Sequence, residues 1–407
     1  MWRYWRALPP KGRIGILFGS WYTAPIIDRV FKRTRAKDLA TSVEEINRFE
    51  RMLADDGALI LKFWFHLSKK RQRKRLKDLQ SDPRTSWRIT PRDWDFFKVY
   101  DRFYSVSEDA LRETNTAWSP WIVVDGSDPE YRAVTVGQTL LAALKARLAG
   151  QPAVSAKSEA APLIRSVDNK DVIAAMDLSV TLPKARYEKA LAKEQARLAL
   201  LTRHPRFKDH NVIAAFEGAD AAGKGGAIRR ITAAIDARLY QVIPVAAPTE
   251  EERAQSHLWR FWRHLPMKGR FTIYDRTWYG RVLVERVEGF AAERDWMRAY
   301  AEINDFEHQL ARHGAIICKY WLQCSKEEQY RRFKDREKTR FKHFKITEED
   351  WRNRKKWDAY QRAVADMVER TSTPYAPWRL VAANDKYHAR VTVLKILCDR
   401  IEAALEG

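Results

Sequence analysis

The second half of the chain contains a segment with the residue types and spacing of a phosphate-binding loop, Gly218-Ala219-Asp220-Ala221-Ala222-Gly223-Lys224-Gly225. The apolar run before it, 211–217, predicts a buried strand, and the spacing over 227–235 predicts a helix. In this order of elements, glycines let backbone N–H groups close on phosphate oxygens, and the helix N-terminus favours negative charge. We predict that Lys224 pairs with the phosphate that is transferred. The predicted phosphate-binding glycines are Gly218, Gly223 and Gly225.

Two carboxylates near this loop predict a site for a divalent cation. Gly225 occupies the position where such loops usually carry a Ser or Thr that binds Mg²⁺, so another oxygen must take that role, and Asp220 inside the loop is suited to it. A second apolar run, 270–275, predicts a strand that ends at Asp275, where this kind of fold places a second carboxylate that reaches the metal, usually through water. We therefore predict Mg²⁺ at Asp220 and Asp275, with Arg276 neutralising phosphate charge.

A basic segment over residues 326–356 carries 13 Lys or Arg against 7 Asp or Glu. Its helical spacing from 327 to 337 predicts a helix, and its charge suits a mobile cover over a long polyanion. One alternative is a solvated helix face of mixed charge. Another is nucleic-acid binding by bases stacked on the interleaved rings of Phe333, Phe341 and Phe344. Phosphate bound at the predicted loop already accounts for the cations of this segment, so we expect no nucleic acid as a partner.

An internal repeat runs through the chain at one constant offset of 257 residues. Glu45-Ile46-Asn47 recurs as Glu302-Ile303-Asn304, and Trp21-Tyr22 recurs as Trp278-Tyr279. Further matches at this offset are Glu50 with Glu307, Lys62 with Lys319, Trp64 with Trp321, and Pro120-Trp121 with Pro377-Trp378. A single register held over roughly 140 residues predicts a duplicated domain.

The first copy lacks charges that the predicted chemistry needs. They are lost at four matched positions: Phe18 for Asp275, Gly19 for Arg276, Ala24 for Arg281 and Leu79 for Arg336. The strand and loop that open the second copy have no counterpart, because the offset places them before Met1. We therefore expect the first copy to be truncated at its N-terminal side, degenerate and without catalysis.

Length and composition are those of two globular domains. We predict a first domain at 1–148, a linker at 149–165, where small and helix-breaking residues gather, and a second domain at 166–407 that includes an amphipathic helix at 184–201. The three cysteines show no paired spacing, which argues against a disulfide framework and a zinc site.

The net charge of +22 favours polyanionic partners, and by itself it does not distinguish nucleic acid, nucleotides, polyphosphate or an anionic membrane surface. The sequence contains no run of 18 apolar residues, and its first residues lack the apolar centre of a secretory signal. We expect a cytoplasmic protein without membrane attachment.

Taken together, the motifs resemble the polyphosphate kinase 2 family, and most closely its two-domain members that act as polyphosphate:AMP phosphotransferases. The motifs are Gly218-Ala219-Asp220 with Gly223-Lys224-Gly225, Tyr274-Asp275-Arg276 with Trp278-Tyr279, Glu285-Arg286-Val287, Thr371-Ser372-Thr373, Ala376-Pro377-Trp378 and Asn384-Asp385-Lys386. The resemblance implies an α/β fold of the P-loop NTPase, thymidylate-kinase-like type, in which helices and a helical lid flank a parallel sheet, here in two tandem copies with the first truncated and degenerate. It also implies Mg²⁺ dependence.

Carried over by position, the resemblance implies a catalytic core of Asp220, Lys224, Asp275, Arg276 and Glu285. It implies phosphate ligands from the lid at Arg332, Lys334 and Arg336. Arg340 stands where the lid of this family is expected to carry Pro, which leaves the local geometry of the lid open.

The implied reaction transfers the terminal phosphoryl group of polyphosphate to AMP and gives ADP. Within the same class, ADP as acceptor would give ATP. An ATP-dependent nucleotide kinase would share the loop without needing an extended basic track, and a non-catalytic polyanion-binding scaffold would not need the intact Asp220, Lys224 and Asp275. We expect the two copies to pair within one chain as two identical subunits would, and a homo-oligomer is also compatible with the sequence.

Overall fold

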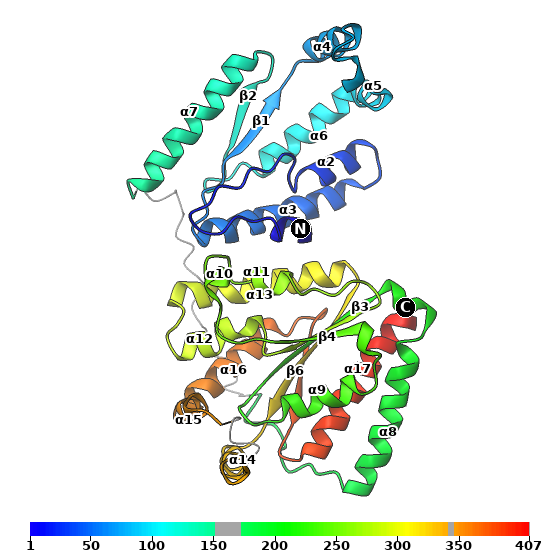
Figure 1. Cartoon of the computed structure of the whole chain (residues 1–407), viewed down its shortest axis with the longest axis vertical. Coiled ribbons are helices and arrows are strands. Elements are labelled where there is room, and N and C mark those ends of the chain that lie inside the picture. The colour runs from blue at the N-terminus through cyan, green and yellow to red at the C-terminus, as the bar shows by residue number, and fades with distance from the viewer. Residues whose placement is uncertain (151–171, 341–345, 407) are drawn as a thin grey trace. The chain divides into compact units, whose positions relative to one another are not determined.

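The chain divides into two compact units, Met1–Ser158 and Glu159–Gly407 (Figure 1). The computed structural model describes residues 1–150, 172–340 and 346–406. The predicted linker at 149–165 lies outside the described residues except for 149 and 150, and so do Phe341 and Phe344 of the basic segment.

Unit 2 is built on a five-stranded sheet with the order β4-β5-β3-β6-β7, in which every pair of neighbours is parallel. The strands are β3 (Asn211–Gly218), β4 (Tyr240–Pro244), β5 (Phe271–Asp275), β6 (Ala315–Gln323) and β7 (Trp378–Ala382). A parallel strand covered on both faces needs a continuous apolar run. The central strand β3 meets this condition, since residues 212–216 are all 0% exposed. The predicted parallel sheet and both predicted strands are confirmed.

Helices cover both faces of this sheet, with α8, α9 and α17 on one side and α13 and α16 on the other (Figure 1). The α-helices of unit 2 are α8 (Lys184–Leu201), α9 (Lys224–Thr232), α10 (Glu250–Arg253), α11 (Trp259–Trp262), α12 (Val284–Val287), α13 (Glu293–Arg312), α14 (Lys326–Lys338), α15 (Glu348–Lys355), α16 (Trp357–Thr371) and α17 (Lys386–Glu406). Short 3₁₀ turns lie at Pro205–Asp209, Ala237–Leu239 and Trp278–Val282. The predicted helices at 184–201 and 327–337 are confirmed as α8 and α14. The helix predicted at 227–235 begins and ends three residues earlier, as α9, because it starts directly after Gly223.

Unit 1 contains a two-stranded parallel sheet in its described part. Its elements are α1 (Trp2–Trp5), α2 (Thr23–Val30), α3 (Ala36–Asp55), β1 (Lys62–His66), α4 (Lys69–Ser81), a 3₁₀ turn at Ser86–Arg88, α5 (Pro91–Lys98), α6 (Tyr100–Glu113), β2 (Trp121–Asp125) and α7 (Pro129–Leu148). The register pairs Lys62 with Trp121, as β6 and β7 pair Lys319 with Trp378. The repeat in the sequence is therefore a repeat in the fold.

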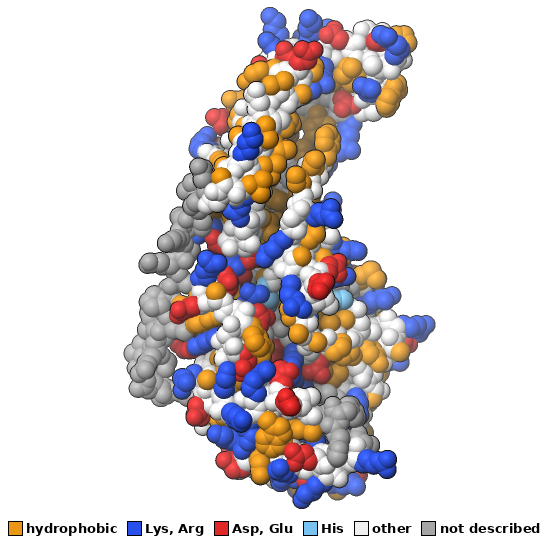
Figure 2. All heavy atoms as spheres, turned by 60° about the vertical axis from the view of Figure 1, so that its left-hand side comes forward, with side chains coloured by type: hydrophobic (Ala, Val, Ile, Leu, Met, Phe, Trp, Pro, Cys, Tyr) orange, Lys and Arg blue, Asp and Glu red, His pale blue; other side chains and the backbone are white. Residues whose placement is uncertain are grey.

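Residues 14–18 of unit 1 correspond to β5 but lie in no strand. In unit 2, β5 is paired on one side by β3 and on the other by β4, and unit 1 has no strand at either position in its described part. Without those partners, Ile16 and Phe18 are 87% and 106% exposed, respectively. Figure 2 shows hydrophobic side chains at the surface of unit 1, in the upper part of the view. The described part of this unit thus matches the edge of the unit 2 sheet that β6 and β7 form.

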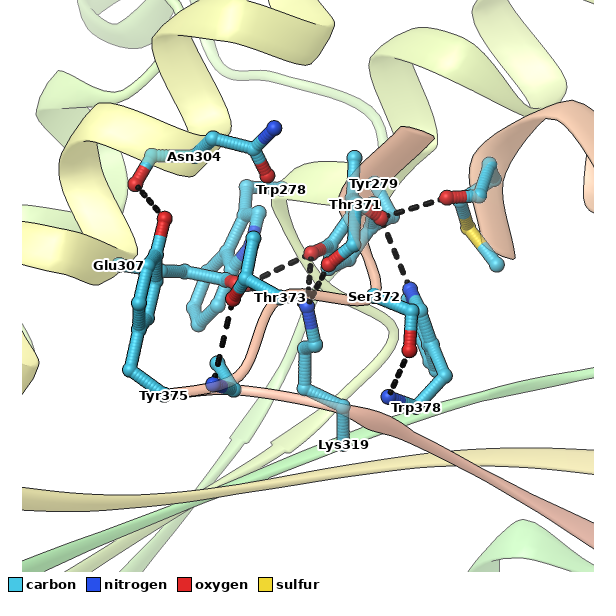
Figure 3. Close-up of polar contacts among 12 residues, drawn as sticks. Trp278, Tyr279, Asn304, Glu307, Lys319, Thr371, Ser372, Thr373, Tyr375 and Trp378 are labelled. Atoms are coloured by element: carbon cyan, nitrogen blue, oxygen red, sulfur yellow. Dashed lines mark hydrogen bonds and ion pairs between the residues drawn. The ribbon is translucent and has the colours of Figure 1, made fainter. Parts of the chain in front are cut away.

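A buried ion pair joins α13 to β6 in unit 2 (Figure 3). The Nζ atom of Lys319 donates to Glu307 Oε2 at 2.7 Å, and both side chains are 0% exposed. The same Nζ atom donates to the hydroxyl of Tyr279 at 2.8 Å and to the carbonyl of Thr371 at 2.6 Å. Trp278 Nε1 and the Tyr279 hydroxyl both donate to Glu307 Oε1. The charges are thus paired and hydrogen-bonded, as buried charges must be.

The same network recurs in unit 1, residue for residue, at the offset of 257. Lys62 Nζ donates to Glu50 Oε2 at 2.8 Å, to the Tyr22 hydroxyl at 3.0 Å and to the Thr114 carbonyl at 2.7 Å. Trp21 Nε1 donates to Glu50 Oε1 at 2.9 Å. These contacts explain why the same residue types recur at the matched positions of the repeat.

Glu307→Gln keeps the shape of this side chain and removes its charge. We expect the free energy of unfolding of unit 2 to fall by about 3–5 kcal/mol, because the ammonium group of Lys319 is left buried without its counter-charge. Denaturant unfolding followed by tryptophan fluorescence measures the change. The matched variant Glu50→Gln should weaken unit 1 by a similar amount and leave the transition of unit 2 in place. An unchanged transition in both variants would contradict this account.

Candidate active site

The loop between β3 and α9 has the backbone conformation of a phosphate-binding loop. Gly218, Ala221 and Gly223 have positive φ angles of 154°, 62° and 109°. A Cβ atom on Gly218 would lie 2.5 Å from the carbonyl oxygen of Leu322 on β6, so only glycine fits there. Lys224 Nζ donates to the Gly218 carbonyl at 2.9 Å and lies across the loop that it is predicted to serve.

A buried acid, Glu217, lies at the start of this loop and is 5% exposed. Its carboxylate accepts from the backbone N–H of Thr277 at 2.7 Å and from the Thr277 hydroxyl at 2.8 Å. Burial raises the pKa of Glu217, and the nearby charges of Lys224 and Arg276 act in the opposite direction. Glu217 therefore joins the carboxyl ends of β3 and β5, where the loop and Arg276 meet.

Asp220 is held by two side chains from other elements. Its Oδ2 atom accepts from Asn353 Nδ2 at 2.9 Å, and its Oδ1 atom accepts from Arg276 Nη2 at 3.4 Å. Burial lowers the pKa of Arg276, but the charges of Asp220 and Glu217, with smaller contributions from other acids, outweigh it, so the pKa of Arg276 is raised. Arg276 itself has a positive φ of 65°, which turns the chain directly after β5.

Asp275 ends β5, as predicted. Within the described residues its side chain makes no hydrogen bond and no ion pair, and its charge acts on Arg276. Parallel strands end at a common edge, so the ends of β3 and β5 bring Asp220, Asp275 and Arg276 to the same edge of the sheet.

A cavity of about 90 Å³ lies beside the loop. Its lining includes Glu217, Asp220 and Arg276, together with Asn353 from α15 and Tyr360 from α16. Neither Lys224 nor Asp275 belongs to the lining. The corresponding cavity of unit 1 has a larger volume, about 600 Å³. Six of its lining residues match lining residues of the unit 2 cavity at the offset of 257. They are Trp64, Gln72, Tyr100, Phe103, Tyr104 and Ser107.

The three lid residues predicted to bind phosphate have different surroundings. Arg332 donates to the carbonyl oxygens of Ala221, Ala383 and Asn384 at 2.9, 2.7 and 2.8 Å, so it supports the loop from behind. Lys334 donates to Glu337 at 2.9 Å and lies 5.2 Å from the ring centre of Trp351. Arg336 lies in the last turn of α14. None of these three lines the cavity.

Glu285, in α12, forms an ion pair at 2.8 Å with Arg281, four residues before it in the chain. It also does not line the cavity. Three residues that sequence reasoning did not single out are Glu217, Asn353 and Tyr360. A signal for the last two was present in the repeat, since the matching residues of unit 1 are Phe96 and Phe103.

Charge on the surface is mixed. On the face shown in Figure 2, Lys and Arg side chains are interspersed with Asp and Glu over both units. The structure therefore offers no single basic field on that face. In the described parts of the chain, no helix is both long and apolar enough to cross a membrane.

Comparison with known proteins gives consistent matches. The model of the polyphosphate kinase 2 family matches residues 1–152 and 181–406. The polyphosphate:AMP phosphotransferase of Pseudomonas aeruginosa is 57% identical over 403 residues, which cover 99% of this chain and 81% of the relative. That of Acinetobacter johnsonii is 39% identical over 411 residues, which cover 98% of this chain and 81% of the relative. An ADP-polyphosphate phosphotransferase of Pseudomonas aeruginosa is 38% identical over 220 residues, 54% of this chain and 72% of the relative.

A solved structure agrees with these relatives. A crystal structure described as a polyphosphate kinase 2 from Pseudomonas aeruginosa superposes with a TM-score of 0.87 at 52% identity. The match covers 100% of this chain and 80% of the other. The two units thus recur together in a solved structure of the same type.

Gly218→Ala tests the loop geometry. We expect it to lower the free energy of unfolding of unit 2 by about 1–3 kcal/mol, because the new methyl group meets the Leu322 carbonyl and the φ angle disfavours a side chain. Gly225→Ala is the matched control, since a Cβ there meets nothing within 4 Å. It should change stability by less than about 1 kcal/mol. Equal denaturant midpoints for the two variants would contradict the account of Gly218.

Proposed function

This chain belongs to the polyphosphate kinase 2 family, and we propose that it transfers the terminal phosphoryl group of inorganic polyphosphate to AMP, giving ADP. The observation that carries the proposal is 57% identity across 99% of this chain to a polyphosphate:AMP phosphotransferase. The relative named for ADP aligns over 54% of the chain at 38% identity. ADP as acceptor, with ATP as product, is therefore the less supported alternative.

The residues at the carboxyl edge of the sheet suit this chemistry. In the transfer, the bond between the terminal phosphorus and the bridging oxygen of polyphosphate breaks, and polyphosphate, one unit shorter, keeps the electron pair. A new bond forms from an oxygen of the AMP phosphate. That phosphate is already ionised near neutral pH, so positioning and charge stabilisation account for most of the rate, and no strong base is required.

We assign the roles as follows. The backbone N–H groups at Gly218, Gly223 and Gly225 bind the phosphates, and Lys224 and Arg276 stabilise the charge on the transferred group. Glu285 orients the acceptor or a water of the metal, through its place beside Arg281. Arg332 holds the loop in place, while Lys334 and Arg336 bind more distant phosphates of the polymer.

The acidic residues present fit Mg²⁺. The described residues contain no cluster of three or more His, Cys, Asp or Glu that would form an all-protein metal site. Mg²⁺ in phosphoryl transfer usually binds one or two carboxylates together with substrate phosphates and water, and Asp220 and Asp275 supply that number. When bound there, Mg²⁺ supplies charge neutralisation at the phosphate oxygens.

Unit 1 has Phe18 and Gly19 at the positions of Asp275 and Arg276, so we assign it no catalysis. Pairing of unit 1 with unit 2 inside one chain, in the manner of two subunits, stays a prediction from the repeat. A non-catalytic polyanion-binding scaffold does not explain why unit 2 keeps Asp220, Lys224 and Asp275 while unit 1 has Phe18 at the position of Asp275.

The assay combines the full chain, Mg²⁺ and long-chain polyphosphate with AMP, ADP or GMP, and resolves the nucleotide products by chromatography. We expect ADP from AMP, with a rate that depends on polyphosphate chain length. If ATP formed from ADP and no product formed from AMP, the acceptor would be ADP and not AMP. A rate supported by ATP and independent of polyphosphate would identify an ATP-dependent nucleotide kinase instead.

Asp275→Asn and Lys224→Ala test the assigned chemistry. Each should lower kcat by at least about 100-fold, because each removes charge aimed at the transferred group or its metal. Phe18→Ala changes the matching position of unit 1 and should leave kcat unchanged. A near-normal kcat for Asp275→Asn with Mg²⁺ present would overturn the assignment of that carboxylate.

A further inference from the structure

A chain of polar contacts leads from the loop to a buried acid, Glu288, with Asn353 and Tyr360 between them. Asn353 Nδ2 on α15 donates to Asp220 at 2.9 Å, and Asn353 Oδ1 accepts from the hydroxyl of Tyr360 on α16 at 3.1 Å. The same hydroxyl lies 3.4 Å from Glu288 Oε1, just after α12. The contacts fix which way the amide points, because its N–H₂ group faces a carboxylate and its oxygen faces a hydroxyl.

The far end of this chain is anchored. The side chain of Glu288 is 4% exposed and forms ion pairs with Lys356 at 2.9 Å and Arg352 at 3.2 Å. Burial raises the pKa of Tyr360, and the charges of Glu288 and Asp220 act in the same direction. Tyr360 therefore stays protonated and remains a hydrogen-bond donor.

Unit 1 shows that the fold does not need these polar groups. At the positions of Glu288, Asn353 and Tyr360 it has three phenylalanines, Phe31, Phe96 and Phe103. The rings of Phe31 and Phe96 pack edge to face with centroids 5.1 Å apart. Aromatic packing thus replaces the polar chain in the copy that has Phe18 at the position of Asp275, while the network around Glu307 is kept in both copies.

We propose that Asn353, held by Tyr360 and Glu288, is a positioning residue that fixes the carboxylate of Asp220 for its role in phosphoryl transfer. The inference rests on the proposed function and deepens it. A neutral amide can orient a carboxylate without cancelling its charge, whereas a Lys or Arg in its place would compete with a divalent cation. Without the amide, Asp220 is free to turn fully toward Arg276, and its oxygen is no longer presented to the cation.

The test uses the full chain and two readouts. We expect Asn353→Ala to lower kcat by about 10- to 100-fold and to raise the Mg²⁺ concentration for half-maximal rate, with a change of less than about threefold in KM for AMP. Tyr360→Phe removes only the hydroxyl and should shift both quantities in the same direction, by about fivefold, the worth of one hydrogen bond.

The second readout does not depend on turnover. Mn²⁺ is titrated into the protein without phosphate and its binding is followed by water proton relaxation. We expect about 10-fold weaker binding in Asn353→Ala, and no binding in Asp220→Asn. If the wild-type chain turned over no acceptor, the proposed function would fail while this comparison would still decide the role of Asn353.

A control variant separates positioning from packing. Asn353→Phe with Tyr360→Phe installs two of the three phenylalanines of unit 1 and leaves Glu288 in its ion pairs with Lys356 and Arg352, so thermal unfolding should stay within a few degrees of wild type while kcat and Mn²⁺ binding fall as in Asn353→Ala. A raised KM for AMP with unchanged Mn²⁺ binding would instead make Asn353 a nucleotide ligand and overturn the proposal. A loss of stability that tracks the loss of kcat would reduce it to a structural role.

Discussion

The buried contact between Glu307 and Lys319 is the constraint on which the site of unit 2 depends. Burial raises the pKa of Glu307 and lowers that of Lys319, and each charge offsets part of the shift in the other. Such a pair contributes little net stability compared with apolar packing, but breaking it is costly. The pair therefore favours one arrangement of α13 against β6 over others in which the two charges would be separated. Because Glu307 holds Trp278 and Tyr279, it fixes the turn that follows β5, and this turn begins with Arg276, directly after Asp275 at the end of the strand.

The duplication separates what the fold needs from what the chemistry needs. Both units keep the ion pair, its tyrosine and tryptophan donors and its threonine carbonyl. Of the matched positions, only those of unit 2 carry the acidic strand end at Asp275 and the polar chain through Asn353. A packing role predicts that a residue persists wherever the fold persists, and a chemical role predicts that it persists only beside the rest of the site. By this criterion Asn353 and Tyr360 group with Asp275.

The sequence predicted the parallel sheet, the loop and the repeat because each has a local or periodic signature: an apolar run, glycines at fixed spacing and a constant offset. It did not predict the surroundings of Arg332, because a cation on a basic helix looks the same in sequence whether or not it donates to three backbone carbonyls. Asn353 lies in a helix of mixed charge, where one amide carries no pattern. Unit 1 contains residues 14–18 with the apolar character of a strand, yet a strand forms only where a neighbour accepts its hydrogen bonds.

The balance of charge at the loop explains why a phosphate site contains so many acids. Phosphates need cations, and Lys224 and Arg276 supply them, but two cations with nothing opposing them would repel each other and a metal ion. The charge of Glu217 opposes both, and its Oε1 atom accepts two hydrogen bonds from Thr277. The charge of Asp220 opposes that of Arg276, and its other oxygen accepts a hydrogen bond from the neutral amide of Asn353.

Asp275 makes no hydrogen bond or ion pair among the described residues, so of the three acids it is the one whose charge is least neutralised by protein groups. An incoming phosphate that draws Arg276 toward itself would release Asp220 from its ion pair while Asn353 keeps it in place, which couples substrate binding to the exposure of a carboxylate.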